Sequence, residues 1–191
     1  MIIFTEKIFK KCLVMVTVAM ILPFGLCAAE IEGVLFRDTI TVEDKVLEVR
    51  GTGLLRYWGV KAYAGAFYLK KASSSKEALL DRSKRIEIEY LRPIKGKDFG
   101  PATNKGIARN VDAESFKRLL PRIEYHNSLY EDVQPGDRYS LTYIPGRGTE
   151  LALNDKPKGI IKGAEFAAAV FSIWLGPKPI NKSFKKQILN L

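Results

Sequence analysis

The sequence predicts an α+β fold, with a largely antiparallel sheet and helices packed on one of its faces. Residues 45–50 and 85–91 alternate apolar and polar side chains, a pattern typical of half-buried strands. Residues 137–144 and 149–153 form a hairpin candidate around Pro-Gly-Arg-Gly, where glycine accepts a positive φ. Residues 164–175 carry almost no charge and therefore predict a helix that is buried on most sides.

Glycines and apolar runs mark the remaining strands. A short strand is expected at 33–36, and Gly51-Thr52-Gly53 predicts a turn or a bulge. Residues 54–70 are rich in aromatic and small side chains. They predict one long strand, or two strands with a bend at Gly59.

The other helices have recognisable start signals. Three serines precede a short helix at 76–81, and Pro101 fits the first turn of a helix at 98–110. Asp112 is a good N-cap for the next helix, in which apolar residues recur at helical spacing. An amphipathic helix at 183–189 ends the chain.

Residues 1–29 have the three-part layout of a cleaved secretory signal. Three lysines precede the uncharged apolar run 12–26, and residues 27–29 (Cys-Ala-Ala) suit cleavage. An uncleaved membrane anchor is the alternative, which Pro23 and Gly25 disfavour. The expected organisation is a signal peptide at 1–29 and one domain at 30–191, located in the periplasm or secreted.

The formal net charge is +10, and removing the leader's three lysines and Glu6 leaves +8. A basic surface can serve nucleic acid, anionic lipid or acidic ligands. Export argues against a nucleic-acid partner. Because the charges are scattered, a solvated basic surface is the first interpretation, and peripheral contact with an anionic membrane is the second.

The residue types available exclude several kinds of site. Both cysteines, Cys12 and Cys27, lie in the leader, so the mature chain has no thiol chemistry and no disulfide. His126 is the single histidine and lies near the apolar stripe of its helix, which favours a structural role. No nucleophile-elbow or phosphate-loop motif occurs. We therefore expect no metal and no cofactor.

The segment 54–70 offers a different kind of site. If it is extended throughout, its side chains alternate between two faces. One face carries Tyr57, Gly59, Lys61, Tyr63, Gly65 and Phe67. The other carries Arg56, Trp58, Val60, Ala62, Ala64, Ala66 and Tyr68. The small residues leave room either for a closely packed helix or for a cleft. A cleft with aromatic walls and a cation near its end would hold an amphipathic carboxylate.

Several segments, in this order, resemble the chalcone isomerase-like family. They are Gly51 to Arg56 (Gly-Thr-Gly-Leu-Leu-Arg), 61–69 (Lys-Ala-Tyr-Ala-Gly-Ala-Phe-Tyr-Leu), 143–149 (Tyr-Ile-Pro-Gly-Arg-Gly-Thr) with Asn154, and 163–166 (Gly-Ala-Glu-Phe) through 172–176 (Ser-Ile-Trp-Leu-Gly) to Pro179. The resemblance spans roughly residues 31–190 and points to the exported bacterial branch. It implies an open-faced β-sandwich, a curved antiparallel sheet covered by a helical layer, with a ligand cleft between them.

The resemblance also implies a choice of functions. Plant chalcone isomerases close a flavonoid ring, non-catalytic relatives bind fatty acids, and some relatives bind haem. Tyr63 stands where the enzymes have threonine, as in the fatty-acid-binding branch. Phe99 stands where they have tyrosine, and their asparagine position falls near Gly106. The isomerase set is largely missing, so the resemblance favours a non-catalytic binder.

Arg56 and Tyr63 are the ligand anchors that the resemblance implies. The usual arginine position falls on Leu55, which shares a strand face with Tyr63, whereas Arg56 needs a bulge to reach that face. Without a bulge, Lys61 is the nearer cation. Asn104 and Arg109 are further candidates from the facing helix.

Three hypotheses follow. The first is an exported, non-catalytic binder of an amphipathic ligand such as a fatty acid, with haem as a further option. The second is an isomerase or lyase in which Tyr63, Lys61 and Arg56 supply acid or electrostatic stabilisation. The third is an envelope scaffold that docks to a protein or an anionic membrane. The sequence leaves the oligomeric state open.

Overall fold

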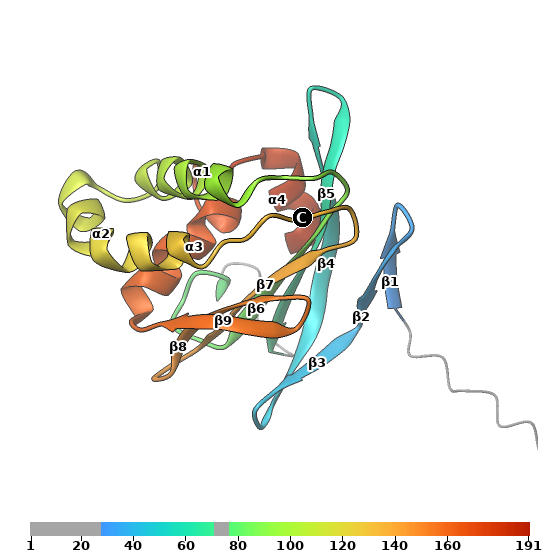
Figure 1. Ribbon diagram of the computed structural model, residues 1–191. Helices are drawn as coiled ribbons and strands as arrows, with labels where there is room; N and C mark the ends of the chain where they lie inside the picture. The colour runs from blue at the N-terminus through green and yellow to red at the C-terminus, as the bar shows by residue number, and fades with distance from the viewer. Residues whose placement is uncertain (1–27, 71–76) are drawn as a thin grey trace, which may run out of the picture.

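The computed structural model describes residues 28–70 and 77–191 (Figure 1). Of the predicted leader at 1–29, residues 1–27 lie outside this part of the chain, and Ala28 and Ala29 belong to the first strand. The strands are β1 (Ala28–Ile31), β2 (Val34–Arg37), β3 (Thr39–Val42), β4 (Lys45–Tyr57), β5 (Val60–Lys70), β6 (Lys84–Tyr90), β7 (Arg138–Ile144), β8 (Gly148–Leu153) and β9 (Lys156–Ile161). The helices are α1 (Gly96–Ala108), α2 (Ala113–Ser128), α3 (Ala164–Leu175) and α4 (Lys182–Leu189). None of these helices has the length and apolar character needed to span a membrane.

The main sheet is an antiparallel meander. Its seven strands lie in the order β3-β4-β5-β6-β7-β8-β9, so every strand pairs with its neighbour in the sequence. The sheet curls, the helices cover one face, and the separate β1–β2 hairpin lies on the other side (Figure 1). The predicted α+β class and the open-faced, helix-covered sheet are both confirmed.

The strongest sequence signals located their elements well. Helix α3 has the predicted bounds, and eight of its twelve residues are buried. At α2, the side chain of Asp112 accepts a hydrogen bond from the backbone amide of Ser115 at 2.8 Å, which is the expected N-cap. The predicted bend at Gly59 is a hairpin turn between β4 and β5.

Other predictions were wrong. In the described part of the predicted helix at 76–81, residues 77–81 form turns and no α-helix. The buried ammonium of Lys84 takes the carbonyls of Ala78 and Leu80 at 2.9 and 2.8 Å, which helical amides would otherwise use. Strands β1, β3 and β9 were not predicted. Strand β9 contains Pro157 and a glycine, which weaken a strand signal but are tolerated at a sheet edge.

Gly51-Thr52-Gly53 lies inside β4, where its glycines let helix α4 approach. A Cβ on Gly51 would lie 2.3 Å from the Gln187 carbonyl oxygen, and a Cβ on Gly65 would lie 2.7 Å from the ring of Phe184. A Cβ at Gly51 would require the helix backbone to move, and a Cβ at Gly65 would require the buried ring of Phe184 to move. The glycines therefore let α4 lie directly on β4 and β5, and the predicted turn is instead part of a strand next to a bulge at Arg50.

Each face of the sheet carries a hydrophobic core, one larger than the other. The larger core lies between the sheet and the helices and includes Phe67, Phe166 and Phe171. A smaller core lies between the sheet and the β1–β2 hairpin, built around Phe36 and Tyr68. Side chains alternate between these two cores along β5, as the period of a strand requires.

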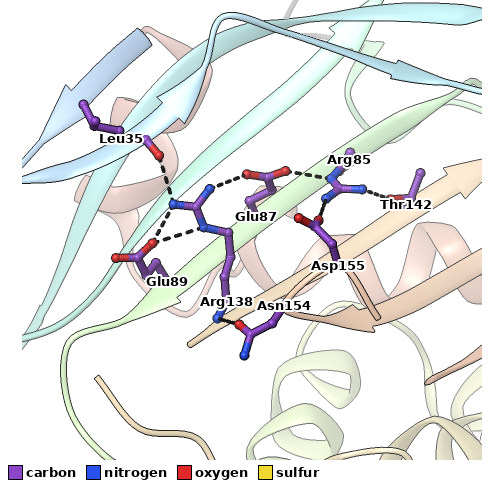
Figure 2. Close-up of polar contacts among 8 residues, drawn as sticks. All are labelled: Leu35, Arg85, Glu87, Glu89, Arg138, Thr142, Asn154 and Asp155. Atoms are coloured by element: carbon purple, nitrogen blue, oxygen red, sulfur yellow. Dashed lines mark hydrogen bonds and ion pairs between the residues drawn. The ribbon is translucent and has the colours of Figure 1, made fainter. Parts of the chain in front are cut away.

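Charged side chains tie the hairpin to the outer face of the sheet (Figure 2). Arg138 donates to Glu87 at 3.2 Å, to Glu89, and to the backbone carbonyl of Leu35 at 2.9 Å, which belongs to β2. Arg85 donates to the other oxygen of Glu87 at 2.9 Å. The Glu87 side chain is only 7% exposed, so this carboxylate depends on the two guanidinium groups.

Replacing Arg138 by methionine should lower the free energy of unfolding by about 2–4 kcal/mol, because Glu87 and Glu89 lose their shared cation in a mostly buried setting. Urea denaturation measures this loss. Arg147→Met is the matched control, since Arg147 pairs with Glu43 and Glu150 at an exposed site and should cost less than ~1 kcal/mol. Equal losses in the two variants would show that the Arg138 cluster does not hold the hairpin.

Candidate functional site

A cavity of about 200 Å³ lies between the helical layer and the sheet. Its floor is aliphatic and comes from the sheet, with Ile86 and Ile88 of β6, Leu141 of β7 and Leu151 of β8. Its roof comes from α1 and α3, with Phe99, Ala102, Thr103, Ile173 and Trp174. The cavity therefore lies where the sequence resemblance implied a cleft.

Aromatic rings form one wall of the cavity. Tyr63 faces Tyr90 across β5 and β6, with ring centroids 6.0 Å apart, and Tyr90 lies 6.2 Å from Tyr139 of β7. Phe99 of α1 stacks on Tyr130 at 4.7 Å. Alternation along three neighbouring strands places the three strand tyrosines on the helix-facing side. The bulk of these rings separates the helical layer from the sheet.

The tyrosine hydroxyl groups give the cavity its polar character. The Tyr63 hydroxyl accepts a hydrogen bond from the indole nitrogen of Trp174 at 3.1 Å, and the Tyr139 hydroxyl accepts from the amide of Glu131 at 2.7 Å. The Tyr90 side chain is buried in the same wall. Burial raises the pKa of Tyr63 and of Tyr90, so both remain protonated and can donate at neutral pH.

Charge is nearly excluded from the cavity. Of the charged residues that the structure describes, only Asp98 lines it, and this side chain is exposed at the start of α1. No described lysine or arginine lines the wall. An ionised carboxylate inside would therefore lose its hydration without gaining an opposite charge, a cost of several kcal/mol.

Arg56 and Lys61, the two predicted cations, lie on the opposite face. Both side chains bind Glu32 in the β1–β2 turn, Arg56 at 3.0 Å and Lys61 at 2.5 Å. The bulge near Arg56 is present, but the extra residue is Ala62 in β5, between the Leu55–Tyr63 and Arg56–Lys61 pairs. Leu55 and Tyr63 share the helix-facing side, as regular alternation predicted. The extra residue turns Lys61 to the outer side with Arg56, so the expectation of a cation beside Tyr63 was wrong.

Asn104 and Arg109, the two further candidates on α1, also lie outside the cavity. The Asn104 side-chain oxygen accepts a hydrogen bond from Asn127 at 2.8 Å, which joins α1 to α2. Arg109 is exposed at the C-terminal end of α1. Of the five residues singled out from the sequence, only Tyr63 lines the cavity.

Sequence reasoning missed most of the aromatic wall. Tyr90 and Tyr139 occupy the apolar positions of period-two strands, so a search for inward-facing tyrosines on neighbouring strands could have found them. Tyr130 follows α2, and its place in the wall depends on how α2 packs. Trp174 lies in a helix that is apolar all round, so no polarity pattern shows which side faces the cavity.

Comparison with known proteins gives the family. A family model described as chalcone isomerase-like matches residues 28–190. The chain belongs to this family. A comparison with curated proteins finds no match. Among solved structures, this chalcone isomerase-like chain is similar to a fatty-acid binding protein from Arabidopsis thaliana, with a TM-score of 0.65 and 15% identity over 83% of this chain and 92% of the other. At 15% identity, the structural similarity shows that the two proteins share a fold.

His126 supports the cavity from behind. It is fully buried, and its Nε2 lies 2.9 Å from the hydroxyl of Tyr130, which is in turn 3.5 Å from the Thr103 hydroxyl. The Nδ1 atom is buried with no partner among the described residues. The histidine therefore positions a wall residue, as expected for a structural role. Residues 28–70 and 77–191 contain no group of three or more potential metal ligands around it or elsewhere.

Acidification should destabilise the protein through His126. Burial lowers the pKa of His126 from 6.5 to about 4. Between those values the unfolded chain binds the proton and the folded chain does not, so stability is complete above pH 6.5 and falls as the pH drops toward 4. The contribution is about 3 kcal/mol at most. Urea midpoints measured across this range should fall less steeply for His126→Phe, and parallel curves would contradict the assignment.

Proposed function

We propose that this protein is an exported, non-catalytic binding protein for a small hydrophobic molecule held in the cavity between helices and sheet. The observation that carries the proposal is the apolar cavity with hydroxyl groups on one wall and no cation among the described residues that line it. Such a space suits an apolar body with one polar group. The shared fold with a fatty-acid binding protein supports a ligand of this general kind. The leader-like sequence at 1–29 supports a place of action in the periplasm or outside the cell.

The wall chemistry narrows the ligand class. Tyrosine hydroxyls donate and accept hydrogen bonds and suit a hydroxyl, carbonyl or ester oxygen. A fatty acid-like skeleton therefore fits best when its polar end is uncharged, because an ionised carboxylate would meet no described cation and would approach Asp98. Haem fits less well, since it carries carboxylates. Among the usual haem ligands, the described lining contains no histidine, cysteine or methionine and offers only tyrosines.

The residues that an isomerase would need are not assembled in the cavity. Tyr63 lines it, whereas Lys61 and Arg56 bind Glu32 on the other face. The Tyr63 hydroxyl already accepts from Trp174. With its pKa raised by burial, it is suited to hydrogen bonding and unsuited to act as a base near neutral pH. The geometry thus favours binding over turnover.

Two matched ligands test the proposed class. Isothermal titration at pH 7 should show tighter binding of decanol than of decanoate, by roughly tenfold or more, because only decanoate must bury a charge. Native mass spectrometry of protein taken from the producing cells should also show a co-purifying apolar molecule. A preference for decanoate would contradict the neutral-end assignment, and no binding of either ligand together with a bare mass would reject the carrier function.

Blocking the cavity should remove binding without disturbing the core. Ala102 lines the cavity and is exposed, so Ala102→Trp would fill the entrance from the surface of α1 and should weaken decanol binding by roughly tenfold or more. Ala108→Trp is the matched control, because Ala108 is exposed at the end of the same helix and does not line the cavity. If both variants bind as the parent protein does, the ligand binds elsewhere.

A further inference from the structure

The turn between β4 and β5 exposes large apolar side chains that the fold does not use. Tyr57 is 69% exposed, Trp58 is 89% exposed and Val60 is 47% exposed. The hairpin projects beyond the helical layer and the rest of the sheet (Figure 1). Tyr57 and Trp58 contact each other edge to face, with ring centroids 6.3 Å apart. Exposed residues of this size, gathered on one tip, mark an interaction site.

The residue in the turn contradicts local backbone preference. Trp58 has φ of +50° and Gly59 has φ of +78°, so both central residues of the two-residue turn are left-handed. Turns of this type favour Asn-Gly, because asparagine accepts a positive φ far more readily than a bulky residue. Tryptophan at this position therefore opposes the preferred turn conformation, and its side chain is left 89% exposed. A choice that opposes both local conformation and burial points to a function at that position.

Two cations lie directly behind the aromatic tip. The side chains of Arg56 and Lys61 are 49% and 45% exposed and flank Tyr57 and Val60 on the two strands. They share one carboxylate, Glu32, so the group keeps a net positive charge. From the tip of the hairpin toward the sheet, the aromatic rings come first and the cations follow. The same order occurs in segments that place Trp and Tyr at a membrane interface and Lys or Arg near lipid phosphates.

The shape of the surface favours a bilayer over a protein. A stable protein interface buries about 800 Å² on each partner, whereas this surface consists of a narrow tip of four residues, 57–60. A projecting tip can enter the interfacial layer of a bilayer without a matching surface. We propose that the β4–β5 turn is a membrane-docking site that inserts Tyr57 and Trp58 into the interface of an anionic phospholipid bilayer.

Docking through this tip would bring the cavity close to the lipid. Tyr63 of the cavity wall follows Val60 by three residues on β5, about 10 Å along a strand. Ile180, also in the cavity lining, is 43% exposed. A hydrophobic ligand could then pass between bilayer and cavity over a short path. The docking itself does not depend on the cavity holding a ligand.

Vesicle flotation tests the docking site. The parent protein is purified in the form that the producing cells release. Mass spectrometry determines its N-terminus, and all variants are prepared with the same N-terminus. Trp58→Asn restores the preferred Asn-Gly turn and so should fold at least as well. It should bind phosphatidylglycerol–phosphatidylcholine vesicles roughly tenfold more weakly than the parent protein. Val46→Ser is the control, because Val46 is 53% exposed at the far end of β4, and its binding should be unchanged.

Fluorescence supplies a second readout. The chain has two tryptophans, so in Trp174→Phe the emission comes from Trp58 alone. That emission should shift to the blue on addition of the anionic vesicles and should shift less at high salt. Equal vesicle binding of the parent protein and Trp58→Asn, or an unshifted Trp58 emission, would overturn the proposal. Self-association that is lost in Trp58→Asn without vesicle binding would assign the tip to a second copy of the chain and would also overturn it.

Discussion

The distance between the helical layer and the sheet determines where this protein has a cavity. Where β4 and β5 carry Gly51 and Gly65, helix α4 lies against the backbone of the sheet, with distances that leave no space for a Cβ. Farther across the sheet, Tyr63, Tyr90 and Tyr139 project into the same layer and hold α1 and α3 away from the strands. A cavity remains on the tyrosine side.

The cavity and the outer face of the sheet differ in the charges that they carry. The helix-facing side holds the cavity, whose single described charged residue is Asp98 at the rim. The outer face holds the guanidinium groups of Arg85 and Arg138 with their carboxylates, and these groups attach the β1–β2 hairpin (Figure 2). An ion costs most where water is excluded, so the outer face, where carboxylates and guanidinium groups pair, accommodates charge that the lining of the cavity nearly lacks.

The cavity and the aromatic tip share strand β5, which connects two surfaces suited to lipid-like molecules. Tyr63 lines the cavity, and Trp58 projects just before the strand begins. A binding site that carries a hydrophobic molecule must exchange it with a phase in which that molecule dissolves. A tip that anchors the mouth near a bilayer would shorten the passage through water, where each exposed apolar surface is penalised.

The sequence by itself determined the class of the fold and the order of most of its strands and helices. These features follow from local patterns, namely period-two strands, the Asp112 cap and the nearly uncharged stretch at Ala164–Leu175. Only the tertiary structure decided where Arg56 and Lys61 point and which rings enclose the cavity. One extra residue in β5, at Ala62, reverses the direction of the side chain before it. No local pattern records on which strand such an extra residue falls, because its position is set by the pairing between strands.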